Sequence, residues 1–328
     1  MNSPLLSLPG AVPADPPDAG VAWHYGDPLR EQRSLTDGEG FVDLSHREVV
    51  RIAGPDRLSW LHSLTTQHLE RLAPHEATTA LVLSPQGRVE HAMAMVDDGS
   101  AVWAHVEPGT SAALVDYLTM MRFRADVDVA EVTGDYAVVW EPGREGETPY
   151  LVRAGERGRE LFVPRAELPA YAERRGSPAG VWAYEALRIA AHEPRFGRDT
   201  DHKTIPHEVG WIGTAVHLDK GCYRGQETVA RVHNTGHPPR RLVFLHFDGS
   251  VETLPAHADA VEHEGREVGQ VTSSARHHEL GPIGLAVVKR NVPVDATLVA
   301  GGVAAAQEVI VSPDAGLHLR PKQLLRRD

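Results

Sequence analysis

The most specific stretch of this sequence lies at residues 220–227 and reads KGCYRGQE. Its centre is Cys222, the one cysteine among 328 residues, which is flanked by glycines that let the backbone turn sharply or approach a ligand closely. Lys220 and Arg224 each lie two residues from Cys222, and a helix predicted to begin near Gly225 adds the positive end of its dipole. Positive charge beside a thiol favours the thiolate, so the octet indicates a functional cysteine, with a buried and inert one as the alternative.

The composition narrows the class of protein to which this octet belongs. A single cysteine excludes an intrachain disulfide and any all-cysteine metal or iron–sulfur site built by this chain alone. The length predicts about two domains, and 41 % apolar with 24 % charged residues is enough for a packed core. The sequence lacks an apolar run long enough to span a membrane, and the net charge of −12 argues against broad nucleic-acid binding. Lys and Arg are missing before Arg30, which is unlike a secretory signal and predicts a cytoplasmic protein.

The pattern of apolar residues before the octet predicts a mixed α+β fold. Its order is strand, helix, strand, strand, strand, helix, strand, which is typical of helices on one face of an antiparallel sheet. The helix over 110–122 has Thr110 as its expected N-cap, and residues 85–87 (PQG) predict a hairpin turn. The expected strands are 49–53, 78–84, 88–97, 101–106, 126–132 and 136–140, and a further helix is expected over 177–190.

The two ends of the chain and the segment around the octet differ from this pattern. Residues 1–20 hold five prolines and little apolar pattern, which predicts a flexible leader. Residues 192–240 are irregular and rich in His, Gly and Pro, which is typical of a functional segment. Short strands separated by glycine and proline then predict a small, separate β-barrel. Its expected strands are 242–247, 267–274, 283–288, 297–300 and 304–311.

The octet resembles the signature of the YgfZ family, the folate-binding relatives of the glycine cleavage T-protein, an aminomethyltransferase. The resemblance extends from about residue 41 onward. Residues 49–64 are similar to the family's strand-then-helix entry, and residues 84–88 (SPQGR) are similar to its hairpin turn. Residues 188–208 resemble the segment that leads to the signature, and residues 269–286 resemble part of the C-terminal barrel.

The resemblance implies an α+β fold in which two ferredoxin-like units and a C-terminal antiparallel β-barrel form a ring around a central folate site. The implied organisation is a leader at 1–20, two interleaved folate-binding units over 21–240, and the barrel over 241–328. The second unit covers roughly 95–175. The implied function is support of iron–sulfur cluster assembly or repair, and so of tRNA-modifying and other iron–sulfur enzymes. The implied partners are folate and iron–sulfur assembly proteins or their client enzymes.

A candidate site follows from this resemblance and from the chemistry of folate. Cys222 is the predicted functional thiol, with Lys220 as a second catalytic candidate. Tyr223 is placed to stack on an aromatic ring, and basic residues suit the carboxylate tail of tetrahydrofolate or a one-carbon derivative. Gln226 and Glu227 either bind the pterin or stabilise the start of the helix at Gly225. The expected folate-binding residues are Gly221, Tyr223, Gly225, Gln226, Glu227, Arg231, Arg241 and Glu90.

Two departures from the aminomethyltransferases bear on activity. The transferases carry paired aspartates after the hairpin glycine, where this chain has Glu90 and His91, and a pterin-binding glutamate where this chain has Ala190. These departures argue against aminomethyl transfer, whereas a folate-dependent one-carbon transfer stays open. The alternatives are an aminomethyltransferase of the glycine cleavage type, with Glu90 as its carboxylate, and a non-catalytic folate-binding scaffold for a cluster-assembly partner.

The 19 histidines do not form a recognisable metal motif. His233 and His237 have the i, i+4 spacing of a helical metal site, but Asn234, Thr235 and Gly236 predict a turn between them. We therefore expect no metal site in this chain.

Overall fold

The computed structural model describes residues 1–143, 145–250 and 252–316, which form two compact units. The first unit comprises Met1–Ser63, His68–Ala80 and His91–Leu187. The second unit comprises Leu64–Gln67, Leu81–Glu90 and the chain from Arg188 onward. Within the described residues, every helix is too short or too polar to cross a bilayer.

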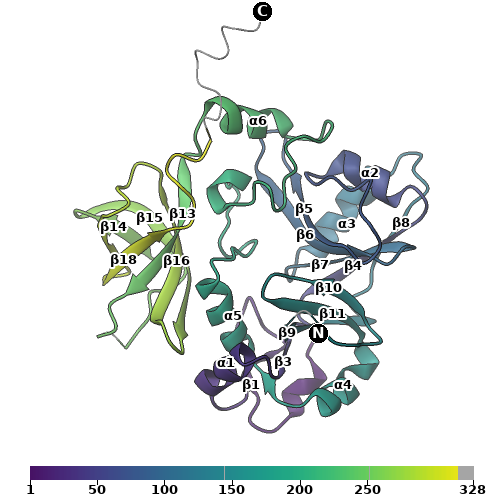
Figure 1. The fold of residues 1–328 in the computed structure, drawn as a ribbon, viewed down its shortest axis with the longest axis horizontal. Helices are drawn as coiled ribbons and strands as arrows, with labels where there is room; N and C mark the ends of the chain where they lie inside the picture. The colour runs from purple at the N-terminus through teal and green to yellow at the C-terminus, as the bar shows by residue number, and fades with distance from the viewer. Residues whose placement is uncertain (144, 251, 317–328) are drawn as a thin grey trace, which may run out of the picture. The chain divides into compact units, whose positions relative to one another are not determined.

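The first of two five-stranded sheets has the strand order β5-β6-β7-β4-β8 (Figure 1). The sequence of strands and helices is the one predicted, and the tip of the β5–β6 hairpin groups with the second unit. All six residues of β7 are buried, as expected for a central strand covered on both faces. The elements are β4 (Glu48–Ala53), α2 (Arg57–Leu64), β5 (Ala77–Leu83), β6 (Val89–Asp97), β7 (Ala101–Val106), α3 (Ser111–Met120) and β8 (Asp128–Glu131).

The start of α3 corrects one prediction. Thr110 occupies the N-cap position, but its side chain does not cap the helix; its hydroxyl donates instead to the carbonyl of Glu107. The Glu48 carboxylate on β4 accepts from the backbone N–H groups of Thr110 (3.0 Å) and Ser111 (2.7 Å). Burial alone raises the pKa of Glu48, but these N–H groups hold it below its ordinary value. A residue distant in sequence thus caps the helix.

The second sheet of the first unit has the order β10-β11-β9-β3-β12. The helix expected over 177–190 begins only at Val181, because Pro178–Ala179 forms a short strand parallel to β3. The strands are β3 (Phe41–Asp43), β9 (Tyr136–Pro142), β10 (Leu151–Ala154), β11 (Gly158–Pro164) and β12 (Pro178–Ala179). The other elements are η1 (Pro4–Ser7), β1 (Val12–Pro13), β2 (Ala22–His24), α1 (Pro28–Thr36), η2 (Arg165–Glu167), α4 (Leu168–Arg175) and α5 (Val181–Ala190).

Residues 1–20, where we expect a flexible leader, include a first turn that packs within the first unit. Leu5 is 2 % exposed and packs into a cluster with Phe41 and Leu161. The Ser3 hydroxyl donates to the carboxylate of Asp43, and its oxygen accepts from the Leu5 N–H. Prolines limit the conformations of an unfolded segment as well as a folded one, so a proline-rich stretch with one buried leucine can be ordered.

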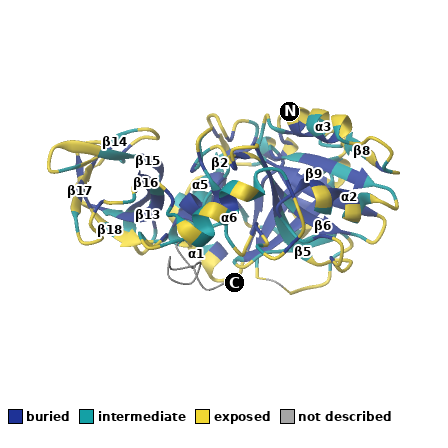
Figure 2. Cartoon of the chain, turned by 90° about the horizontal axis from the view of Figure 1, so that it is seen from above, coloured by how far each residue is buried: buried dark blue, intermediate teal, exposed yellow. Residues whose placement is uncertain are grey.

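The C-terminal part of the second unit is a closed barrel with the order β13-β16-β15-β14-β17-β18. Its interior holds a cluster of buried apolar residues, among them Val243, Ala286 and Leu298. Figure 2 shows buried stretches, in dark blue, along the barrel strands. Five of its strands were predicted, but β14 was not, because it holds one fully buried residue, Val261, beside an irregular register. The strands are β13 (Arg240–Phe247), β14 (Ala260–His263), β15 (Arg266–His277), β16 (Gly281–Lys289), β17 (Thr297–Ala300) and β18 (Val303–Val309).

The segment before the barrel is largely irregular, as predicted. It holds the single-turn helix η3 (Pro206–Val209) and the helix α6 (Gln226–Thr235). Gly236 ends α6, so His237 lies outside the helix as the turn signal predicted. The predicted α+β class with an antiparallel C-terminal barrel is therefore confirmed. The ring around a folate site stays a prediction.

Candidate functional site

The second unit positions the octet at residues 220–227 by packing the start of α6 against the β5–β6 turn. Gly225 has φ +83°, and a Cβ there would lie 2.5 Å from the Ser84 carbonyl oxygen. Gly87 has φ +76°, and its Cβ would lie 2.7 Å from Cβ of Thr228 on α6. Both positions combine a left-handed backbone with a close approach, so both require glycine. This contact joins the hairpin turn and the octet into one structure.

The buried side chain of Lys220 holds the octet in place. Its side chain is buried at 5 % exposure, and its ammonium donates to the backbone carbonyl of Thr65. The same nitrogen lies 5.1 Å from the centre of the Tyr223 ring, a distance typical of a cation–π contact. Burial raises the pKa of Tyr223 to about 12. The Gln226 side chain donates to the Lys220 carbonyl at 3.4 Å, which closes the loop on itself.

Three further hydrogen bonds hold neighbouring segments of the chain beside this loop. The His217 N–H donates to the Thr66 carbonyl (2.9 Å), and the Thr66 hydroxyl donates to the Ala215 carbonyl (2.6 Å). The Val89 N–H donates to the Thr204 carbonyl (2.9 Å). The octet is therefore built on a backbone that three separate parts of the sequence fix together.

Arg224 and Glu90 form an ion pair at the surface of this loop. One guanidinium nitrogen lies 2.8 Å from Oε2 of Glu90, and the two side chains are 35 % and 38 % exposed. Exposed ion pairs of this kind contribute about 0–1 kcal/mol to stability, so either side chain can leave the pair for another partner at little cost. The structure thus brings together two predicted features, the octet and the carboxylate after the hairpin.

The remaining predicted residues divide between surface and core. Cys222 is an exposed, free thiol, and Gly221 beside it is exposed. Glu227 and Arg231 are exposed on α6, which begins one residue earlier than Glu227. Arg241 is fully buried in the barrel, where it donates to the Val292 carbonyl (3.0 Å) and to the Gln307 side chain (2.9 Å). Burial lowers the pKa of Arg241. Its hydrogen bonds to the barrel do not join it to the octet.

A second arginine, Arg240, ties the irregular segment to the barrel. It donates to Asp201 (2.7 Å) and, through Nη2, to Glu208 (2.8 Å). Burial alone raises the pKa of Asp201, but hydrogen bonds, first from Arg240, hold it well below its ordinary value. Arg188 and Asp199 form a second, fully buried tie at 2.8 Å, and Asp199 also accepts from Ser273 of β15. The sequence did not predict either set of ion pairs, because no motif in the sequence marks Asp199, Asp201 or Glu208 as a partner of an arginine.

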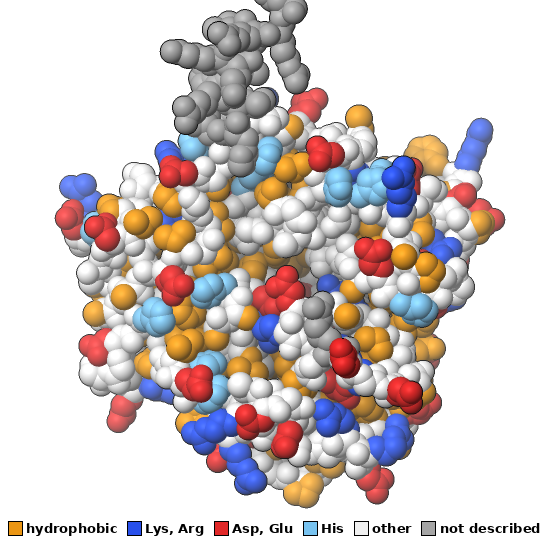
Figure 3. All heavy atoms as spheres, in the orientation of Figure 1, with side chains coloured by type: hydrophobic (Ala, Val, Ile, Leu, Met, Phe, Trp, Pro, Cys, Tyr) orange, Lys and Arg blue, Asp and Glu red, His pale blue; other side chains and the backbone are white. Residues whose placement is uncertain are grey.

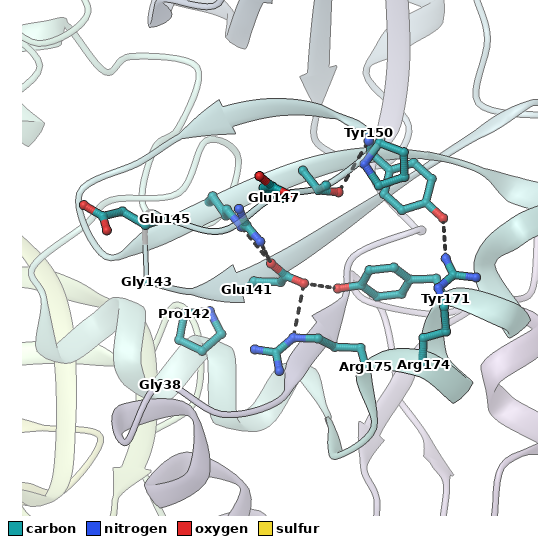
Figure 4. A pocket seen from close by; sticks show the side chains of 13 residues that line it. Gly38, Glu141, Pro142, Gly143, Glu145, Glu147, Tyr150, Tyr171, Arg174 and Arg175 are labelled. Atoms are coloured by element: carbon teal, nitrogen blue, oxygen red, sulfur yellow. Dashed lines mark hydrogen bonds and ion pairs between the residues drawn. The ribbon is translucent and has the colours of Figure 1, made fainter.

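The first unit holds a pocket of about 730 Å³ that the sequence did not predict. Figure 4 shows the Glu141 carboxylate at its centre, with Tyr171 and Arg175 pointing toward it. Glu141 accepts from Tyr171 (2.6 Å), from Arg175 (3.2 Å) and from Arg159 (2.7 Å). Burial and the neighbouring carboxylate raise the pKa of Tyr171 above its ordinary value. Glu141 is thus fully engaged by the protein itself, which indicates a structural role.

Comparison with known proteins identifies one domain and several distant relatives. Residues 240–313 match the glycine cleavage T-protein C-terminal barrel domain. The chain is 25 % identical over 307 residues to an aminomethyltransferase of Parasynechococcus marenigrum, covering 79 % of this chain and 82 % of that protein. It is 27 % identical over 307 residues to an aminomethyltransferase of Nostoc sp., covering 79 % of each.

A solved structure shows the same fold. The crystal structure of glycine cleavage system aminomethyltransferase T from Bartonella henselae superposes with a TM-score of 0.75 at 18 % identity. The match covers 96 % of this chain and 98 % of that one. The comparisons thus show a T-protein C-terminal barrel domain over residues 240–313, sequence similarity to aminomethyltransferases over about 79 % of the chain, and a shared fold.

Proposed function

We propose that this chain is a tetrahydrofolate-binding protein of the YgfZ type, which supports iron–sulfur cluster assembly or repair through Cys222. The observation that carries the proposal is the construction of the octet. Its lysine is buried as an anchor, its arginine pairs with Glu90, and its cysteine is exposed. A loop held this firmly positions one accessible thiol, which is what a reacting residue requires.

Folate as the cofactor is supported by the superfamily, since several relatives are named aminomethyltransferases. Arg224 is the octet cation suited to a folate carboxylate. Its ion pair with Glu90 is exposed and weak, so an anionic ligand can replace Glu90 beside Arg224 at little cost in free energy. Lys220 is unsuited to that role, because moving its ammonium would leave the buried Thr65 carbonyl without this donor.

The chemistry at Cys222 needs a second molecule. The chain has one cysteine, so a disulfide, persulfide or cluster ligand formed there involves a partner protein or a small thiol. The acidic and basic side chains on the face drawn in Figure 3 are interspersed among the described residues, which suits protein partners better than a nucleic acid.

The first experiment titrates the full chain with tetrahydrofolate, followed by calorimetry and thermal unfolding. We expect saturable binding and a rise in Tm with ligand concentration. Arg224→Gln should weaken binding, whereas Arg266→Gln, at an exposed arginine of β15, should not. A failure to bind tetrahydrofolate at high micromolar concentration would refute the cofactor assignment.

The second experiment replaces the thiol in cells. Cys222→Ser should lower the activity of iron–sulfur enzymes in a strain that lacks the wild-type protein, while the purified variant still binds tetrahydrofolate. If enzyme activity is unchanged, the thiol is dispensable and the folate-binding scaffold becomes the better description.

The relatives named aminomethyltransferase make that activity the second candidate. It is tested by a glycine-cleavage assay with purified H-protein, comparing wild type with Glu90→Gln. Under our proposal neither protein supports the reaction. Activity in the wild type that Glu90→Gln abolishes would favour the transferase.

A further inference from the structure

Three side chains that can bind a metal converge at the end of α2 in the first unit. His62 lies in the last turn of the helix, and His68 and Glu70 lie in the loop that follows. One potential ligand atom from each residue lies within 4.8 Å of the other two. The centres of the two imidazole rings are 4.8 Å apart, and the ring planes are nearly perpendicular at 80°.

The backbone that carries these residues is fixed by packing. Leu61 and Leu69, each next to a histidine in sequence, are fully buried. The Leu69 N–H donates to Nδ1 of His62 at 3.2 Å, which orients that ring. The two imidazoles are half-buried and Glu70 is exposed. The cluster is therefore held by the fold and open to solvent on its carboxylate side.

We propose that His62, His68 and Glu70 bind a divalent transition-metal ion, for which Zn²⁺ is the best fit. Two imidazoles and one carboxylate are a ligand set that zinc accepts, with water in the fourth position. Bond lengths near 2.0–2.2 Å place tetrahedral ligand atoms about 3.4 Å apart, so a pair of ligand atoms separated by the full 4.8 Å must close by about 1.4 Å. Glu70 is exposed and can make this adjustment by rotation. The carbonyl end of α2 adds a negative potential that favours a cation.

Binding at either nitrogen of His62 has a defined consequence. A neutral imidazole has one lone pair on its two nitrogens. A metal at Nδ1 replaces the Leu69 N–H directly, and a metal at Nε2 requires Nδ1 to carry a proton. In both cases the hydrogen bond from Leu69 is lost. The amide of Leu69 therefore reports on occupancy.

The experiment measures Zn²⁺ binding to the full chain, without a polyhistidine tag, by competition with a chromogenic chelator. Co²⁺ absorption serves as a second probe of the ligand set. We expect one tight ion per chain, and a loss of at least about 10- to 100-fold in affinity for His68→Gln or Glu70→Gln, because that is the range for losing a residue that only supports a metal ligand. The control His202→Gln removes an exposed histidine beside an acidic residue and should leave affinity unchanged.

Two further readouts separate a built site from surface histidines. Zn²⁺ should raise the Tm of wild type and His202→Gln but not of His68→Gln, whereas all three should unfold alike in chelator. Hydrogen exchange at the Leu69 amide should accelerate in wild type when Zn²⁺ is added. Equal Zn²⁺ affinity in wild type and His68→Gln, or an equal loss in His202→Gln, would overturn the proposal.

Discussion

Replacing Gly225 by alanine should destabilise the second unit strongly, because two separate penalties act at this position. The backbone is left-handed at φ +83°, and a non-glycine residue there costs about 1–2 kcal/mol. The added Cβ would also lie 2.5 Å from the Ser84 carbonyl oxygen and 3.0 Å from Cα of Gly87. Both are backbone atoms, which cannot rotate away, and such overpacking costs about 1–3 kcal/mol. The sum is about 2–5 kcal/mol of unfolding free energy.

Gly221 is the matched control within the same octet. A Cβ at Gly221 meets no atom within 4 Å among the described residues, and its backbone is outside the left-handed region. Gly221→Ala should be neutral or stabilise by about 0.4–1 kcal/mol, since alanine restricts the unfolded chain. Two substitutions with the same chemistry, four residues apart, should thus have opposite outcomes.

The assay is urea unfolding followed by tryptophan fluorescence and circular dichroism. With a slope near 2 kcal/mol per M, Gly225→Ala should lower the midpoint of the second unit by about 1–2.5 M. Gly221→Ala should leave the midpoint within error of wild type or slightly above it. If the two variants unfold at the same urea concentration, the start of α6 does not pack against the hairpin turn, and our account of the octet is wrong.

Three other predictions test single features of the fold. Glu48→Ala removes the cap of α3 and should cost about 0.5–2 kcal/mol in urea unfolding, whereas Thr110→Val, which spares the cap, should cost less. Leu5→Ala should cost about 2–5 kcal/mol if residues 1–20 are ordered, against about 0–0.5 kcal/mol for the exposed Leu29→Ala; equal small losses would restore the flexible leader. The pKa of Asp201 in the folded protein lies below its ordinary value. As the pH falls, the Asp201 carboxylate is therefore protonated in the unfolded chain before it is protonated in the folded one. Stability should therefore decline below about pH 4, and Asp201→Asn should flatten that decline; parallel acid curves would contradict it.

Local patterns predicted the elements well where they are set by neighbouring residues. The order of strands and helices around α2 and α3 followed from apolar periodicity, and most barrel strands followed from turn signals between them. The helix α6, which begins within the octet, starts and ends close to its predicted bounds, because Gly225 and Gly236 mark both ends. The short strand β14 was not predicted, because a single buried side chain does not form an alternating apolar pattern.

Partners distant in sequence could not be predicted. Lys220 bonds the Thr65 carbonyl, a residue 155 positions away, although its nearness to Cys222 suggested a catalytic role. Glu48 caps a helix that begins 63 positions later. Arg241 was expected at the ligand, yet it is buried within the barrel. A sequence reveals which residues carry charge, whereas only the fold decides which backbone groups they satisfy.

The pair of Arg224 and Glu90 links the two candidate functions to one geometry. In the transferase alternative Glu90 is the proposed acting carboxylate, and in the structure it accepts two hydrogen bonds from Arg224 (2.8 and 3.4 Å). To act on an amine, Glu90 must first leave Arg224, whereas a folate carboxylate that takes over Arg224 releases Glu90 at the same time. A ligand tail bound at Arg224 would therefore free the carboxylate that the transferase reaction needs. Glu90→Gln separates the cases, because it removes the base from a transferase but leaves Arg224 more available to an anion.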